Sequence, residues 1–177
     1  MRSCRYALLA AALSVVVAAR AEGQTKVVPP VPAAALQKLL PAVEGWTSGV
    51  ARADIVELSP EAKYSFASVT LTKNGHRVKI QIADTGFSAD IQTALATMIV
   101  TLPEDYSGTV GSASIKRTPV GGSPAVESWD AEKSQGEIVV LVGGRFIVTV
   151  EAAKADGLPT LRALVEKVDL KALAALK

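Results

Sequence analysis

The chain is poor in the residues that most enzyme sites use, with one cysteine and one histidine among 177 residues. Cys4 lies before an apolar N-terminal stretch, so the rest of the chain has no disulfide, thiol nucleophile or cysteine metal ligand. His76 is predicted at the shoulder of a hairpin, where it would be solvated. A catalytic triad or a zinc site needs more than one exposed imidazole, and no D-x-D-x-D-G calcium spacing occurs. We therefore predict no catalytic residue, no cofactor and no metal.

The first 24 residues, MRSCRYALLAAALSVVVAARAEGQ, have the pattern of a secretory signal peptide. Arg2 and Arg5 precede an uncharged apolar stretch, residues 6–19, which is shorter than the roughly 20 residues of a membrane span. The small residues Ala19 and Ala21 fit a cleavage site. We predict cleavage after Ala21, a soluble product without a membrane span, and a periplasmic or secreted location.

Positive charge is also scarce once this segment is removed. Three of the 19 basic residues lie within residues 1–21, whereas all 17 acidic residues follow, so the mature chain has a net charge of −1. Its lysines and arginines form no run. A nucleic-acid partner is therefore not expected.

Residues 22–35 contain three prolines without hydrophobic periodicity, which predicts an extended leader ahead of a single domain, residues 36–177. A short helix is predicted over Ala33–Val43, with Pro41 interrupting it. The sequence GWTSG at 45–49 predicts a turn, and residues 50–58 predict a strand.

The most regular segment is YSFASVTLTKNGHRVKIQIADT, residues 64–85. Asn74-Gly75 is the preferred pair of a two-residue hairpin turn, because both positions need positive φ. Folding there pairs Leu71 with Val78 and Thr70 with Lys79, which leaves one apolar and one polar face.

A second hairpin is predicted in EIVVLVGGRFIVTVEA, residues 137–152. A turn at Gly143-Gly144 would pair Val142 with Arg145 and Leu141 with Phe146. β-branched residues follow the glycines, whereas a phosphate-binding loop would need a helix there. Both strands are largely apolar, as in the centre of a sheet.

The remaining segments complete an α+β pattern. A helix is predicted to start after Ser88, a polar loop to cover 101–112, and two proline-containing strands to lie within 113–130. Helices are predicted to close the chain over 157–177, with Asp169 as a cap. The resulting fold class is α+β, a mostly antiparallel twisted sheet of about six to seven strands built from hairpins, with helices packed on it.

Two aspartates leave an enzyme alternative open. Asp84 begins the D-T-G triplet of aspartic proteases, and the segment Leu141-Val142-Gly143 resembles the apolar support of such a site. Phe87 departs from that pattern, as does the helix predicted next, and a strand-to-helix turn remains the other interpretation of D-T-G. Asp130 follows Trp129, a combination found in sugar sites, although Trp is also an ordinary core residue.

Three residues are candidate contacts for a ligand or partner: Trp46, Trp129 and Arg145. The tryptophans offer large flat surfaces, and Arg145 beside the Gly-Gly turn can bind a carboxylate in bidentate fashion. An acid on a neighbouring strand is the alternative partner for Arg145.

The segment LVGGRFIVTVEA, followed by LRALVEKVDLKALAALK, resembles uncharacterised secreted bacterial proteins that share a G-G-R-F hairpin and a closing D-L-x-x-L helix. This likeness covers mainly residues 125–177 and implies no known activity. The signal peptide and the order of elements are also similar to the Mog1/PsbP-like α+β family of small binding proteins, as an analogy of fold.

Together these features predict an exported, non-catalytic binding or assembly module of the bacterial cell envelope, with an unknown envelope protein or small ligand as partner. The alternatives are an acid-based hydrolase that uses Asp84 or Asp130, and an extracytoplasmic sensor domain with a partner at a sheet edge.

Overall fold

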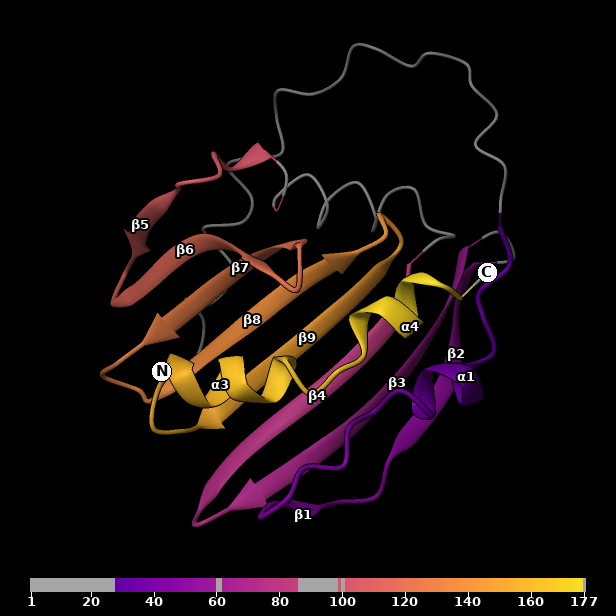
Figure 1. The fold of residues 1–177 in the computed structure, drawn as a ribbon, viewed down its shortest axis with the longest axis horizontal. Coiled ribbons are helices and arrows are strands. Elements are labelled where there is room, and N and C mark those ends of the chain that lie inside the picture. Colours follow the sequence, from indigo (N-terminus) through magenta and orange to yellow (C-terminus); the bar gives the residue numbers. More distant parts are fainter. Residues whose placement is uncertain (1–27, 60–61, 86–98, 100, 177) are drawn as a thin grey trace.

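The computed structural model describes residues 28–59, 62–85, 99 and 101–176 of the chain (Figure 1). The predicted signal peptide and the helix predicted from Ser88 lie outside these residues, apart from Ile99.

The fold is built on one open, antiparallel sheet of nine strands. Their order is β1-β3-β4-β9-β8-β7-β6-β5, and β2 also pairs with β3. The strands are β1 (Thr47–Ser48), β2 (Arg52–Ser59), β3 (Ala62–Lys73), β4 (His76–Asp84), β5 (Ser107–Val110), β6 (Ala113–Val120), β7 (Ser123–Asp130), β8 (Gln135–Val142) and β9 (Phe146–Lys154). The antiparallel sheet is therefore confirmed, but the expected six to seven strands are too few. The extra strands, β1 and β5, are short and fall where a turn and a polar loop were predicted.

The β3–β4 hairpin has the predicted turn and register. Asn74 and Gly75 have φ of 50° and 80°, and Lys73 pairs with His76 at the end of the ladder. The apolar side chains consequently fall on one face of the two strands and the polar ones on the other.

The β8–β9 hairpin is also present, but its predicted register is wrong by one residue. Val142 pairs with Phe146, not with Arg145, because the loop contains three residues, Gly143 to Arg145. Both glycines have positive φ, and the Arg145 amide donates to the Val142 carbonyl at 3.1 Å. The longer loop releases Arg145 from the ladder, so its side chain is free to reach a neighbouring strand.

In the described ranges, three helices lie across one face of the sheet (Figure 1): α1 (Ala33–Gln37), α3 (Leu158–Val165) and α4 (Leu170–Ala174). Buried side chains of these helices, among them Leu36, Leu161 and Leu173, belong to the same cluster as the apolar residues of β3, β4, β8 and β9. We call this side of the sheet the helix-covered face.

The boundaries of the helices have local causes. The Asp169 carboxylate accepts a hydrogen bond from the Ala172 amide at 2.9 Å, which confirms the predicted cap of α4. The first helix is shorter than predicted and ends at Gln37, because the residue before a proline disfavours helical geometry and Pro41 follows closely.

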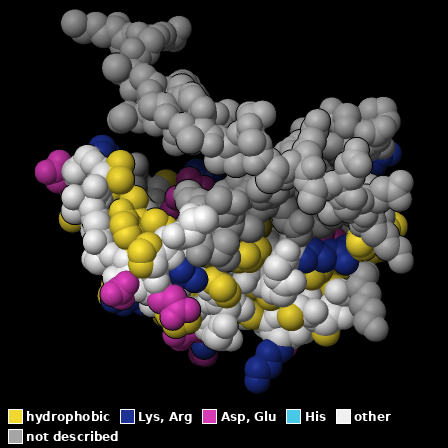
Figure 2. Space-filling model, turned by 90° about the horizontal axis from the view of Figure 1, so that it is seen from above, with side chains coloured by type: hydrophobic (Ala, Val, Ile, Leu, Met, Phe, Trp, Pro, Cys, Tyr) yellow, Lys and Arg dark blue, Asp and Glu magenta, His cyan; other side chains and the backbone are white. Residues whose placement is uncertain are grey.

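The opposite side of the sheet has a smaller apolar cluster near β7–β9, formed by Ile99, Val126, Val139, Leu141 and Ile147. Over β3 and β4 this side presents polar side chains, and we call it the open face. In the view of Figure 2, basic and acidic side chains are interspersed with apolar ones and form no large field of one sign.

The prolines of β6 and β7 lie where no ladder needs their missing amide. Pro119 and Pro124 face each other at the end of the β6–β7 hairpin, outside the β5–β6 and β7–β8 ladders. Both positions are thus edge positions, as expected, because proline cannot donate to a neighbouring strand. No helix in the described parts of the chain is long and apolar enough to cross a membrane.

Candidate functional site

Asp84, the aspartate of the D-T-G triplet, is completely buried at the end of β4 and bound to Arg145. The Arg145 Nε donates to Asp84 Oδ1 at 2.8 Å, and Nη2 donates to Oδ2 at 2.7 Å. The Thr85 hydroxyl donates to the Arg145 carbonyl at 2.7 Å. The hydrogen bonds with Asp84 raise the pKa of the Arg145 guanidinium. This is a bidentate structural ion pair between the end of β4 and the β8–β9 loop.

The same ion pair holds the N-terminal segment against the sheet. The Val31 amide donates to Asp84 Oδ2 at 2.7 Å, and Arg145 Nη2 donates to the Pro29 carbonyl at 2.9 Å. Val31 is buried in the main cluster. The segment predicted as an extended leader is therefore anchored to the domain from Pro29 onward.

This arrangement buries the Asp84 carboxylate and occupies both of its oxygens with Arg145. An aspartic protease needs two carboxylates that share a proton in an open cleft. Asp84 instead faces a guanidinium and a backbone amide in the interior. The alternative interpretation of D-T-G, a structural turn that bonds to the backbone, describes these contacts.

Asp130 is occupied in a similar way at the end of β7. Its carboxylate accepts hydrogen bonds from the Ser112 hydroxyl at 2.7 Å, from the Lys133 ammonium, and from the amides of Glu132 and Lys133 at 3.1 Å each. The hydrogen bond from Lys133, followed by that from Ser112, lowers the pKa of Asp130 to about 2. A glycosidase general acid needs a raised pKa, so Asp130 has the opposite property.

Trp129 lies beside Asp130 in sequence but on the other face of the sheet, because successive strand residues point to opposite faces. The indole packs against the main cluster on the helix-covered face. It lies so close to Gly136 that an added Cβ would be 2.6 Å from Trp129 Cε3 and 2.3 Å from the Ser128 carbonyl oxygen. Trp129 therefore does not form a sugar platform with Asp130.

Trp46 precedes β1 and is partly buried against the same cluster, with the Lys73 ammonium 6.0 Å from its ring centroid. It lines a small hollow that also contains His76, whose Nε2 lies 3.1 Å from Asp156 Oδ1. His76 is thus partly buried and paired, and its predicted solvated position is wrong.

The structure does not bring Trp46, Trp129 and Arg145 into one site. Trp46 lies beside the β3–β4 turn, near Lys73 and His76, whereas Arg145 binds Asp84 at the other end of β4. Nine strand residues separate these ends by roughly 26 Å.

A second ion pair, which joins the buried Glu127 carboxylate to the exposed Arg162, was not anticipated from the sequence. Glu127 on β7 accepts hydrogen bonds from Arg162 on α3, from Nε to Oε1 at 2.8 Å and from Nη2 to Oε2. The hydrogen bonds with Glu127 raise the pKa of Arg162. The only hint in the sequence is that Glu127 follows the apolar residues Ala125 and Val126 within a predicted strand. Its partner comes from a helix 35 residues further along the chain, which no local pattern indicates.

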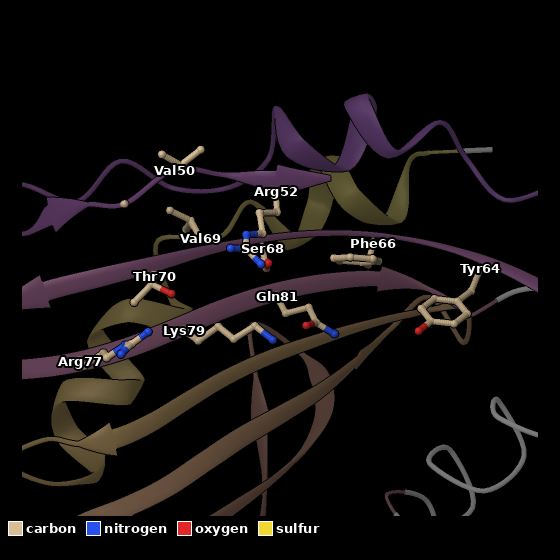
Figure 3. Close-up of a pocket in the computed structure, with 11 residues that line it drawn as sticks. Val50, Arg52, Tyr64, Phe66, Ser68, Val69, Thr70, Arg77, Lys79 and Gln81 are labelled. Carbon is tan, nitrogen blue, oxygen red and sulfur yellow. The ribbon is translucent and has the colours of Figure 1, made fainter. Parts of the chain in front are cut away.

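A hollow with a volume of about 560 Å³ lies on the open face over β2, β3 and β4 (Figure 3). We call it the basic groove. Three cations line it, Arg52 from β2 and Arg77 and Lys79 from β4. Its other polar side chains are neutral: Tyr64, Ser68, Thr70 and Gln81.

Strand pairing explains why these side chains meet. Arg52 pairs with Ser68, and Ser68 pairs with Gln81, so these three residues form one row across β2, β3 and β4. Thr70 and Lys79 form the next row. Figure 3 shows Tyr64 at the end of the groove away from Arg77. Tyr64 and Phe66 have ring centroids 6.4 Å apart.

Two acidic residues of the open face, Glu151 and Glu137, lie on the strands that follow β4 in the sheet, β9 and β8. Glu151 on β9 pairs with Lys79 on one side and with Glu137 of β8 on the other. Partial desolvation, with a contribution from the negative charge of Glu151, raises the pKa of Glu137, whose side chain is still exposed. The open face therefore has a basic part over β2–β4 and an acidic part over β8–β9.

Comparisons of the chain with protein families, with curated proteins and with solved structures give no match. The two resemblances noted from the sequence remain predictions.

Proposed function

We propose that the protein is an exported, soluble, non-catalytic binding module of the bacterial cell envelope, and that its ligand occupies the basic groove. The groove carries this proposal, because it gathers cationic and hydrogen-bonding side chains on a surface without helices in the described chain. Its volume lies in the range of small-molecule sites, roughly 300–1,000 Å³. The N-terminal sequence supports export to the periplasm or medium.

The state of the two candidate catalytic aspartates favours binding over hydrolysis. Asp84 is buried against Arg145, and Asp130 is held ionised by Lys133 and Ser112. A general acid must hold a proton near the working pH and lie within hydrogen-bond reach of the substrate. Neither aspartate meets both requirements.

The groove also favours a ligand binder over a sensor that pairs with a partner at a sheet edge. The outer strand at one edge, β5, has only four residues. A short edge strand offers few backbone groups to a pairing partner.

The test is native mass spectrometry of the protein purified from its own cell envelope. We expect a bound molecule that is lost from a variant carrying Arg77→Gln and Lys79→Gln but retained by a Lys38→Gln variant. Lys38 is exposed at the C-terminal end of α1 and does not line the groove, so it controls for charge. A protein free of ligand, with no partner recovered by cross-linking, would contradict the proposed function.

A further inference from the structure

We infer that the ligand of the basic groove is a small organic polyanion, a molecule with two or more carboxylate or phosphate groups. This inference rests on the proposed function and specifies the chemistry of its ligand. Arg52, Arg77 and Lys79 would bind the anionic groups.

The first observation concerns how the arginines are used. Five arginines lie in the described ranges, and three of them donate to protein oxygens: Arg117 to the Leu102 carbonyl, Arg145 to Asp84 and Arg162 to Glu127. The remaining two, Arg52 and Arg77, form no ion pair or side-chain hydrogen bond within the described chain, and both line the basic groove. Arginine is well suited to bidentate binding of carboxylate and phosphate, so the two free guanidinium groups lie where such a ligand would use them.

The second observation is the imbalance of charge in the groove. Its lining contains three cations and no acidic residue, although the mature chain predicted from the sequence is close to neutral. Asp54, the next β2 residue on the same face, already accepts the Ile55 amide at 2.8 Å. Glu151 is the cross-strand neighbour of Lys79, but no ion pair joins them in the described chain. Like charges held together repel one another, and an anion in the groove would remove that repulsion.

The third observation is the spacing of the cations. Arg77 and Lys79 are two residues apart on β4, which separates their Cα atoms by about 7 Å. Arg52 lies two strands away from β4, at about 10 Å across the sheet. The three positive charges are therefore separated both along β4 and across the strands. This spacing fits a ligand with several anionic groups better than a ligand with one. Ser68, Thr70 and Gln81 lie between them and can donate further hydrogen bonds to oxyanions.

The size of the groove favours a small molecule over a macromolecule. A volume of about 560 Å³ accommodates a compact organic acid or phosphate ester together with its water. The rings of Tyr64 and Phe66 at one end offer a flat surface to an apolar part of such a molecule.

The experiment is a titration of the isotopically labelled exported protein with citrate and with pyrophosphate, followed by amide NMR at low ionic strength. Acetate serves as the monoanionic control. We expect saturable shifts concentrated at β2, β3 and β4, and weak or no saturation with acetate. The triple variant Arg52→Gln, Arg77→Gln, Lys79→Gln should weaken binding at least about tenfold, because each lost charge-assisted hydrogen bond is worth about that factor. Lys38→Gln should leave the affinity unchanged.

Two results would overturn the inference. One is the absence of saturable shifts in the groove with either polyanion. The other is that anionic phospholipid vesicles bind in a groove-dependent way while citrate and pyrophosphate do not, which would assign the groove to a membrane surface. Native mass spectrometry separates this failure from that of the proposed function. If a neutral molecule is released from the groove, the proposed binding function stands and only the inference of a polyanionic ligand fails.

Discussion

The two faces of the sheet treat charge in opposite ways. On the helix-covered face, the buried carboxylates of Asp84 and Glu127 each bind an arginine through two hydrogen bonds. On the open face, Arg52, Arg77 and Lys79 lie together in the basic groove without an ion pair in the described chain. The same types of side chain are thus structural on one face and available to a ligand on the other.

Burial explains the difference. A charge removed from water costs several kcal/mol unless a partner compensates for the lost hydration, so an unpaired arginine or glutamate beneath the helices would destabilise the fold. Exposed charges stay hydrated, and the folded state tolerates them without partners. The comparison predicts large stability effects on the helix-covered face and small ones in the groove.

The largest effect is expected from Asp84→Asn. This change leaves the Arg145 guanidinium, whose side chain is 17% exposed, without its negative partner, and should reduce the free energy of unfolding by about 3–5 kcal/mol. Urea denaturation measures it, with Asp54→Asn on exposed β2 as the matched control. A loss no larger than that of the control would remove the distinction between the faces.

The second ion pair should respond unequally to removal of its two members. Arg162→Ala leaves the Glu127 carboxylate, 1% exposed, buried without a partner, at a cost of about 3 kcal/mol. Glu127→Ala leaves a guanidinium side chain that is 48% exposed and can be hydrated, so the electrostatic part of its cost should be small, about 1 kcal/mol or less.

Urea denaturation of both variants at neutral pH checks this asymmetry, and we expect the larger loss for Arg162→Ala. Equal losses would show that packing, not charge burial, determines the contribution of this pair.

Asp130 provides a further test of the difference between the two faces, because it lies on the open face but its carboxylate has hydrogen-bond partners. Its pKa is lowered from 3.8 to about 2 by Lys133 and Ser112, so the folded state favours the ionised form. This contribution to stability is complete above about pH 4 and is lost as the pH falls toward 2. Asp130→Asn should therefore destabilise the protein at neutral pH, and the difference from the parent should shrink in thermal unfolding between pH 4 and 2. A difference that does not depend on pH would assign the role of Asp130 to the shape of the turn.

The smallest stability effect is expected from the groove itself. The triple variant Arg52→Gln, Arg77→Gln, Lys79→Gln should change the free energy of unfolding by about 0.5 kcal/mol or less, because these side chains are exposed and form no ion pair with another described residue. Removing the repulsion between these three cations should, if anything, increase the free energy of unfolding slightly. A loss of several kcal/mol in urea denaturation would mean that these cations support the fold, and the contrast between the faces would fail.

The local parts of the fold could be predicted because their causes are local. Asn74-Gly75 adopts positive φ, and strict alternation then determines which side chains of β3 and β4 share a face. The Asp169 cap depends on one side chain and an amide three residues later. Even the polar face of this hairpin, which became the floor of the basic groove, is visible in the residue pattern.

The errors arose where one residue changed the geometry. The extra residue in the β8–β9 loop shifted the register and released Arg145 toward Asp84. Trp129 and Asp130 were considered together because they are adjacent in sequence, although strand alternation places them on opposite faces. The strands β1 and β5 were missed because two and four residues carry too little periodicity to be recognised.

The sequence by itself determined the β3–β4 turn, the presence of the β8–β9 hairpin, the antiparallel character of the sheet and the α4 cap, since these depend on neighbours within a few positions. Only the tertiary structure decided the partner of each charge. Asp84 and Arg145 are 61 residues apart, and Glu127 and Arg162 are 35 apart. Arg52 reaches the groove only because β2 pairs with β3. No local pattern encodes such pairings, because they follow from which strands become neighbours and which face of the sheet the helices remove from water.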